Sequence, residues 1–409
     1  MKRISLLLMA FIALFISCGG HDDPEPDPDT GPAEQTILMY MPWAGDDLYP
    51  YLLKNINAME TAIINNGGLG NKKLMVFLCI NPTRSMLISV DYNKGECVRD
   101  TLEHASYGTI EPSYTTVTGI SDIFNKVKAS APARSYALIV GCHALGWLPK
   151  GTSVTSYFGL SKSTGSYHPR YVPVTRFYGN SGDERQQAEI TTLATAVKQS
   201  FGKTDYILFD NCYMSGIEVA YDLKDATDYL IASPTEVLGD GMPYATVGRN
   251  LLKGDYNGVV DGFYNYYKNY TITFKDGHTE DYSCGTLAVI NCEELDAMAS
   301  LMKTINSQFT FDAANREKVQ VMDGIEPTIF FDMGDYLDYL CPDASLLSQA
   351  KAQLDKVVPY KRSTGMFYST YNEQKTLTSK FSGITISDPT NNSKVTKALT
   401  TTAWWKASH

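Results

Sequence analysis

Short, continuous apolar runs alternate with segments of helical periodicity between residue 36 and about residue 255. Runs that are apolar on nearly every residue are typical of parallel strands whose two faces are both covered. The intervening segments carry apolar residues at three-to-four spacing, which is typical of crossover helices. The alternation therefore predicts an α/β fold with a mostly parallel central sheet and helices on both faces.

The expected elements follow from these two patterns. Strands are predicted at 36–41, 74–80, 136–141, 206–210 and 229–233. Helices are predicted at 47–64, 120–129, 190–201 and 216–224. Beyond residue 255 the alternation fades, and helices at 295–306 and 331–340 with a late strand at 383–387 predict an α+β C-terminal region packed on the sheet.

The first 17 residues have the pattern of an export signal. Lys2 and Arg3 precede an apolar run at 6–16 that is too short to cross a membrane and remain there. Ser17-Cys18-Gly19 resembles a bacterial lipobox, although Phe15 stands where leucine is usual. The pattern predicts lipidation of Cys18, with plain cleavage and secretion as the alternative.

The segment 18–35 is rich in proline and acidic residues and cannot bury apolar surface, so we expect an extended tether. With a lipid on Cys18, it would hold the chain at the bacterial outer membrane. An acidic stretch directly behind the lipidated cysteine also resembles a surface-export signal, which makes display on the cell surface a hypothesis. The net charge of -10 and the lack of clustered Lys and Arg argue against nucleic acid as a partner.

Two of the expected strands end in residues that carry chemistry. The strand at 136–141 is followed by Cys142 and His143, and the strand at 206–210 is followed by Asn211 and Cys212. Reactive groups gather at the carboxyl ends of strands in open α/β sheets. A cysteine nucleophile needs a neighbouring imidazole, and the helix expected from residue 216 would favour negative charge on the sulfur. Taken alone, either residue could also be purely structural.

The surrounding sequence resembles the clostripain family of cysteine peptidases. The segment FDNCYMSGIEVAYDL is similar to the family's FDxCxM-x-x-x-EVAY nucleophile motif, and ALIVGCHALGW to its His-Gly-x-Gly-Trp block. Four further blocks, TILMYMPWAGDDL, IASPTEVLGDGMPY, FDMGDYLDYL and FSGITIS, occur in the family's order. The resemblance implies a caspase-like fold, shared with gingipains and legumains. Together with the signal peptide at 1–17 and the tether at 18–35, it predicts a catalytic domain at 36–255 and a C-terminal region at 256–409.

The resemblance also implies roles for individual residues. His143 would be the general base and Cys212 the nucleophile, and the backbone N–H groups of Cys212 and Ala144 would form the oxyanion hole. Ala144 replaces the usual glycine, and it keeps its donor in place if its φ is negative. An inactive pseudo-enzyme is the alternative.

Substrate preference would depend on Asp210. The matching acid of the family lies in the S1 pocket and pairs with an Arg or Lys at P1, through charge-assisted hydrogen bonds. The function implied is a cysteine endopeptidase that cuts proteins or peptides after basic residues. Asp210 could instead be a strand-end acid that caps a turn. Trp147 could line the S1 or S2 pocket, or it could be a core or rim aromatic.

The polar stretch 147–186 is far longer than an ordinary loop of about 4–6 residues. Related enzymes are often made as zymogens that cut their own chain after the histidine block, so we expect self-processing in this loop. The basic residues that could be cut are Lys150, Lys162, Arg170, Arg176 and Arg185.

The chemistry requires no cofactor, and neither a zinc H-E-x-x-H motif nor a G-x-S-x-G elbow occurs in the sequence. Calcium dependence occurs in the family, but without an EF-hand spacing any calcium site would have to be assembled from distant residues. Cys284 and Cys292 could form a disulfide or could stay unpaired. Glu218 and Asp222, one helical turn apart, are expected on a solvated or ion-paired face. The rival function is an inactive surface lipoprotein that binds proteins or glycans.

Overall fold

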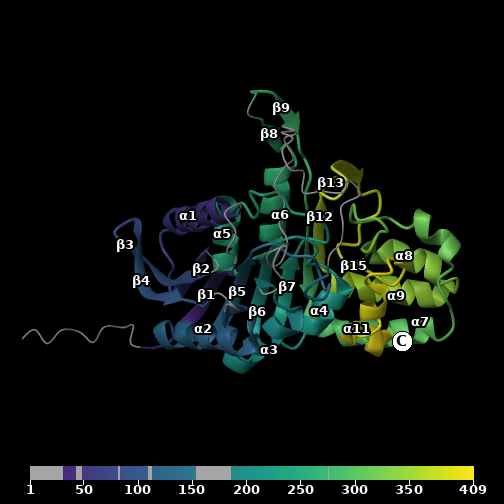
Figure 1. Cartoon of the computed structure of the whole chain (residues 1–409), viewed down its shortest axis with the longest axis horizontal. Helices are drawn as coiled ribbons and strands as arrows, with labels where there is room; N and C mark the ends of the chain where they lie inside the picture. Colours follow the sequence, from purple (N-terminus) through teal and green to yellow (C-terminus); the bar gives the residue numbers. More distant parts are fainter. Residues whose placement is uncertain (1–30, 43–47, 82, 109–112, 153–185, 275) are drawn as a thin grey trace, which may run out of the picture. The chain divides into compact units, whose positions relative to one another are not determined.

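A nine-stranded sheet forms the centre of the protein (Figure 1). The computed structural model describes residues 31–42, 48–81, 83–108, 113–152, 186–274 and 276–409, and Ala33–His409 form one compact unit. The strand order is β12-β10-β7-β6-β5-β1-β2-β3-β4. The strands are β1 (Ala33–Met41), β2 (Lys72–Asn81), β3 (Arg84–Asn93), β4 (Glu96–Ser106), β5 (Ala133–Gly141), β6 (Thr204–Asp210), β7 (Thr227–Ala232), β10 (Thr286–Asn291) and β12 (Tyr360–Ser363).

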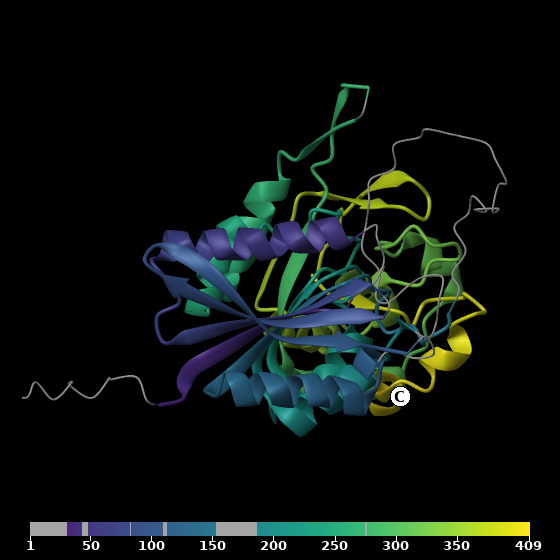
Figure 2. The ribbon, with the colours of Figure 1, turned by 60° about the vertical axis from the view of Figure 1, so that its left-hand side comes forward.

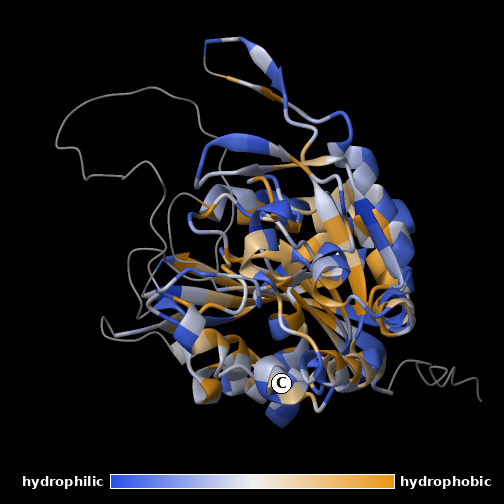
Figure 3. Ribbon diagram, turned by 90° about the vertical axis from the view of Figure 1, so that its right-hand side faces the viewer, coloured by the Kyte–Doolittle hydropathy of each residue, from blue (hydrophilic) through white to orange (hydrophobic). Residues whose placement is uncertain are grey.

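The middle of the sheet is parallel. Strands β2, β1, β5, β6 and β7 pair in parallel, with antiparallel β3 and β4 at one edge and antiparallel β10 and β12 at the other. The parallel strands are buried along most of their length, and Figure 3 shows their apolar residues enclosed by helices with hydrophilic outer surfaces. The predicted α/β architecture is therefore confirmed. The outermost strand β4 is polar and largely exposed, as expected of a sheet edge.

Helices cover both faces of the sheet (Figure 2). One group packs together on one face and comprises α1 (Tyr49–Asn66), α5 (Tyr244–Lys253) and α6 (Tyr256–Tyr267). The other face carries α2 (Val117–Ser130), α3 (Ile190–Ser200) and α4 (Ile217–Leu223). Each of these helices buries its apolar side, so the sheet is shielded from water and its carboxyl edge remains to carry polar groups.

The C-terminal region extends the sheet and also packs beside it. The predicted boundary at residue 255 falls between α5 and α6, while β10 and β12 beyond it join the central sheet. The described part of the chain also contains three two-stranded pairs: β8 (Thr271–Thr273) with β9 (Thr279–Asp281), β11 (Phe331–Asp332) with β15 (Thr385–Ile386), and β13 (Met366–Ser369) with β14 (Gln374–Leu377). The remaining α-helices are α7 (Leu295–Asn306), α8 (Met333–Leu340), α9 (Ala344–Val357), α10 (Thr396–Leu399) and α11 (Ala403–Ser408).

None of the helices within the described ranges is both long enough and apolar enough to span a bilayer. The predicted signal at 1–17, Cys18 and most of the tether lie outside the described residues.

Candidate active site

The carboxyl ends of β5 and β6 bring His143 and Cys212 onto neighbouring turns. In the parallel register of these strands, Gly141 is the partner of Asp210. His143 and Cys212 each lie two residues beyond that pair. Neighbouring strands run about 4.8 Å apart, so the two side chains leave the sheet at the same edge and at the same level.

Two contacts join the turns that carry these residues. The side-chain amide Nδ2 of Asn211 lies 3.0 Å from Sγ of Cys142. Gly146 has a φ of +60°, and a Cβ added there would lie 3.1 Å from the carbonyl oxygen of Tyr213 and 3.0 Å from the ring of Phe330. The turn after His143 therefore packs directly against the residue that follows Cys212.

The sulfur of Cys212 receives a backbone N–H group. Val237, on the segment after β7, donates its N–H to Cys212 Sγ at 3.2 Å. The same segment pairs with the cysteine turn through Tyr213 N to Thr235 O at 3.1 Å and Ser215 N to Ser233 O at 3.0 Å. Helix α4 begins at Ile217, directly after this pairing, with Gly216 as its N-cap. The Val237 N–H is thus a donor to the sulfur, and the expected help from the N-terminus of α4 stays a prediction.

The side chains of His143 and Cys212 are both enclosed. Cys212 is fully buried and His143 is 4% exposed. A peptide cannot reach a sulfur in this state without movement of the surrounding segments.

Asp210 is fully buried at the end of β6. Its Oδ1 accepts the N–H of Met242 at 2.9 Å, and its Oδ2 accepts the hydroxyl of Tyr244 at 3.0 Å. The carboxylate thus faces the segment between β7 and α5. A buried carboxylate in this position favours a cationic group nearby, since burial of a charge is costly unless it is compensated.

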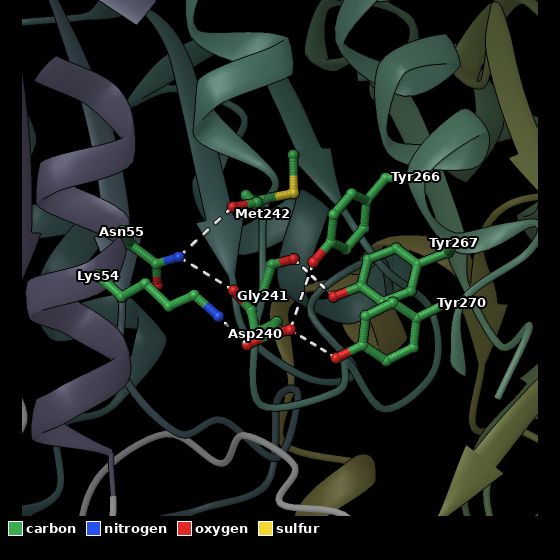
Figure 4. A network of polar contacts seen from close by, with 8 residues as sticks. All are labelled: Lys54, Asn55, Asp240, Gly241, Met242, Tyr266, Tyr267 and Tyr270. Atoms are coloured by element: carbon green, nitrogen blue, oxygen red, sulfur yellow. Dashed lines mark hydrogen bonds and ion pairs between the residues drawn. The ribbon is translucent and has the colours of Figure 1, made fainter. Parts of the chain in front are cut away.

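Helices α1 and α6 hold the segment between β7 and α5 in place (Figure 4). Asp240 pairs with Lys54 at 2.8 Å and accepts the hydroxyl groups of Tyr266 and Tyr270. Burial would raise the pKa of Asp240, but the bonds from Lys54 and Tyr270 outweigh it and lower that pKa. Asp240 therefore stays ionised and keeps the segment tied to both helices.

The backbone carbonyl groups of this segment are tied in the same way. Asn55 donates to the carbonyl of Asp240 at 3.0 Å, and the hydroxyl of Tyr267 donates to the carbonyl of Gly241 at 2.7 Å (Figure 4). The segment that contacts both Cys212 and Asp210 is thus fixed from its outer side.

The remaining predicted residues near the histidine lie as follows. Ala144 is fully buried and is not among the positive-φ residues, which in the described ranges are Lys94, Tyr213 and Glu373 apart from glycines. The alanine therefore needs no glycine-like backbone. Trp147 is 6% exposed, and its Nε1 donates to Ser387 Oγ at 2.8 Å, which anchors the turn to the C-terminal region.

Hydrogen bonds join the residues at the start of the long polar loop to the residues that follow its end. The backbone N–H of Lys150 donates to Glu189 Oε1, and that of Gly151 donates to Gln187 Oε1, both at 2.8 Å. Lys150 is half-buried beside this clamp. The other predicted cleavage points, Lys162, Arg170, Arg176 and Arg185, lie outside the described residues.

Sequence reasoning was wrong about Glu218. This residue is fully buried rather than solvated, and its Oε1 accepts the N–H of Ser387 at 2.8 Å. The helix α4 turns this face toward the C-terminal segment after β15, a contact that helical spacing alone does not reveal. Asp222 is half-buried, and burial raises its pKa to about 6.

Glu236 was missed altogether. It is 4% exposed and binds Tyr213 on the cysteine turn as well as Ser369 and Thr370 at the end of β13. The only sequence signal was its position in the block IASPTEVLGDGMPY, which carries no indication of these distant partners.

The described ranges contain neither a metal-binding cluster nor a disulfide. No group of three or more His, Cys, Asp or Glu side chains there is arranged to hold a metal ion. All seven cysteines within these ranges are free thiols, so the alternative of a Cys284–Cys292 disulfide does not hold. A calcium requirement stays a prediction.

Comparisons with known proteins agree on one family. The sequence pattern of the clostripain family, peptidase family C11, matches residues 40–399. A secreted C11 cysteine protease from Bacteroides thetaiotaomicron, iotapain, is 41% identical over 93% of this chain and 100% of its own, with a TM-score of 0.80. No curated protein matched the chain.

Two further solved structures are similar. A clostripain from Bacteroides thetaiotaomicron, in complex with the peptide inhibitor BTN-VLTK-AOMK, is 47% identical over 57% of this chain and 99% of its own, with a TM-score of 0.53. An inactive zymogen of a C11 protease from Parabacteroides distasonis is 25% identical over 93% of this chain and 99% of its own, with a TM-score of 0.73.

Proposed function

Because this chain belongs to the clostripain family and is a cysteine peptidase, we propose that it is an endopeptidase that cleaves after Lys or Arg through His143 and Cys212. The observation that carries this proposal is the common position of the two residues, each two residues beyond the Gly141–Asp210 pair of β5 and β6. A thiol and an imidazole at one sheet edge form the minimal set for nucleophilic acyl transfer.

The reaction follows from these groups. The Cys212 thiolate attacks the scissile carbonyl carbon, and the resulting oxyanion is stabilised by the backbone N–H groups of Cys212 and Ala144. Imidazolium His143 then gives its proton to the leaving amine, and an acyl-enzyme remains. His143 next takes a proton from a water molecule that hydrolyses the thioester, and the acid product leaves the Cys212 thiolate beside imidazolium His143. Apart from the substrate and the water molecule, all reacting groups are side chains or backbone groups of the protein, so the reaction requires no cofactor.

Asp210 is the proposed determinant of basic specificity. Its carboxylate is fully buried and faces the same segment, residues 237–242, whose Val237 contacts the nucleophile. A Lys or Arg side chain at P1 would compensate the buried charge. The similar clostripain was solved with the peptide inhibitor BTN-VLTK-AOMK, whose peptide sequence VLTK ends in lysine. This supports a basic P1 residue.

Fluorogenic peptides that end in Lys, Arg or Leu test this proposal. We expect cleavage of the Lys and Arg peptides that disappears after thiol alkylation and in Cys212→Ala, but persists in the matched control Cys284→Ala. Asp210→Asn should lower kcat/KM for the basic peptides at least about 100-fold, because one charge-assisted pair is lost. An inactive binding protein would release no fluorophore, and full activity of Asp210→Asn on Lys peptides would overturn the specificity.

We also propose that the chain is made as a precursor, exported and attached to a membrane by a lipid on Cys18. The burial of His143 and Cys212 supports a closed precursor, and one similar structure is an inactive zymogen. The similar iotapain is secreted, which supports export. Cys18→Ser should move the protein from the membrane fraction to the soluble fraction, and an unchanged distribution would argue against the lipid.

A further inference from the structure

Glu236 joins the nucleophile to the C-terminal region. Its carboxylate is 4% exposed and accepts hydrogen bonds from two directions. From the cysteine turn, Tyr213 donates its hydroxyl at 2.7 Å. From the end of β13, Ser369 donates its hydroxyl, and Thr370 donates both its hydroxyl at 2.7 Å and its N–H at 3.0 Å. A buried carboxylate is stable only with such donors. These hydrogen bonds therefore connect the cysteine turn to the end of β13.

Tyr213 and Val237, the residues next to this cluster of hydrogen bonds, both lie beside Cys212. Tyr213 directly follows Cys212 and has a φ of 61°, a conformation that a tyrosine adopts only when its surroundings enforce it. Val237 directly follows Glu236 and donates its N–H to Cys212 Sγ at 3.2 Å, which is shorter than the 3.8 Å from the Cys212 thiol to the Val237 carbonyl oxygen. A shift of the Glu236 carboxylate therefore changes the position of both residues that frame the sulfur.

The rest of the environment keeps Tyr213 rigid and protonated. Its ring stacks on Phe330 with centroids 4.9 Å apart. Burial raises the pKa of Tyr213 well above its usual value, and the Glu236 charge adds to this, so the hydroxyl remains a donor.

The ionisable groups that face Glu236 are Asp323, Tyr213, Tyr368 and Tyr371. Asp323 accepts three backbone N–H groups, and burial raises its pKa to about 7, with the Glu236 charge adding a smaller part. Burial likewise raises the pKa values of Tyr368 and Tyr371, so the three tyrosines are neutral. Glu236 is thus surrounded by donors and by groups that can stay uncharged.

We propose that Glu236 is a positioning residue through which the end of β13 holds the Val237 N–H on the sulfur of Cys212. An N–H aimed at the sulfur favours the thiolate over the thiol. This assigns a task to the C-terminal region: it sets the reactivity of a nucleophile that lies more than 150 residues earlier in the chain. The inference rests on the proposed function, because it concerns the same nucleophile.

The test measures the rate of Cys212 alkylation by iodoacetamide against pH, by mass spectrometry, in the protein that has been brought to its active form. Relative to Glu236→Gln, which removes the same charge, Glu236→Ala should raise the midpoint of this profile by about one pH unit, the effect of about one lost hydrogen bond to a charged group. At neutral pH kcat on a lysyl peptide should fall about 10-fold, with little change in KM. Glu236→Gln, which keeps the shape and an acceptor oxygen, should recover most of both effects.

A second variant guards against misfolding. Ser369→Ala with Thr370→Val removes the hydroxyl donors from β13 and the following turn while Glu236 stays, and it should shift the midpoint in the same direction. Asp332→Asn is the matched control, because that buried carboxylate also accepts three hydrogen bonds, from Asp335 and Ser382, away from Glu236. It should lower the melting temperature without moving the midpoint.

Unchanged midpoints in Glu236→Ala and in the double variant would overturn the inference, even if both proteins were less stable. Failure of the proposed function would look different. In that case Cys212→Ala would cleave the lysyl peptide as well as the unaltered protein does, whatever the alkylation profiles.

Discussion

At the scale of single residues, the pair Glu218 and Asp388 stands out because two carboxyl groups share a buried site. Burial raises the pKa of Glu218 to about 8, with the nearby Asp388 adding to it, and burial raises the pKa of Asp388 to about 7. Glu218 lies on the helix after the nucleophile, and Ser387 links it to Trp147 on the histidine turn. The charge state of this pair therefore bears on the segments next to both His143 and Cys212.

Glu218→Gln tests this environment. A carboxyl whose pKa is higher in the folded than in the unfolded protein stabilises the fold at low pH. That stabilisation is lost as the pH rises from about 4.5 to about 8. We therefore expect the melting temperature of the unaltered protein to fall across this range, and that of Glu218→Gln to fall less and to lie at least about 2 °C higher at pH 8. The exposed control Glu293→Gln should follow the unaltered protein. Parallel curves for Glu218→Gln and the unaltered protein would contradict the assignment.

At the scale of elements, the two turns after β5 and β6 form the site by packing on each other. Gly146 permits this contact, because its positive φ and missing side chain leave room for the Tyr213 carbonyl and the Phe330 ring. The histidine turn is in turn anchored by Trp147 to Ser387. The relative position of imidazole and thiol thus depends on backbone packing rather than on a side-chain hydrogen bond alone.

Gly146→Ala should impair catalysis more than folding. The added methyl group would meet the Phe330 ring at 3.0 Å, in a backbone conformation that costs an alanine about 1–2 kcal/mol. We expect kcat/KM on lysyl peptides to fall at least about 10-fold, since a displaced imidazole loses its alignment. Gly202→Ala is the matched control, because Gly202 also has a positive φ but nothing within 4 Å of its added Cβ. Equal activity of the two variants would show that the contact does not position His143.

Much of the fold could be predicted because buried strands and amphipathic helices leave periodic patterns. All five predicted strands and the four predicted helices of the first part occur, with shifts of a few residues at their ends. The strand β4 was missed because it is a polar edge strand and gives no apolar run, and β3 and β10 were missed although they carry buried apolar residues. β12, like β4, was missed because its four residues are mostly polar.

The candidate site was predictable only where it follows the strands. His143, Asp210 and Cys212 could be found because they stand at strand ends and in recognisable motifs. The role of Glu236 and the burial of Glu218 could not be predicted, because Ser369 and Ser387, which bind them from the C-terminal region, lie more than 130 residues away in the chain. Polar contacts between distant residues leave no periodic pattern in the sequence, so the local sequence does not predict them.

At the scale of the whole unit Ala33–His409, the central sheet brings together strands that are far apart in the sequence. β5 and β6 are neighbours although the long polar loop lies between them in the chain. The two ends of that loop are clamped to each other by Glu189 and Gln187. A cut inside the loop would therefore leave both new ends attached to the same sheet.

Self-processing should yield two chains that stay together. We expect the purified protein to be cut within 147–186 on incubation, after one or more of its basic residues, and both fragments to elute as one species in gel filtration. Cys212→Ala should stay a single chain under the same conditions. If Cys212→Ala were cut at the same rate with no other peptidase present, the chain would not process itself through this thiol.

The most direct test of the central claim is to map where a lysyl peptide with a thiol-reactive group binds covalently. Mass spectrometry of the labelled protein should find a single adduct, on Cys212. Its formation should be slowed by a lysyl substrate and by His143→Ala or Asp210→Asn. An adduct on another cysteine together with loss of activity, or full activity after stoichiometric labelling of Cys212, would contradict the account.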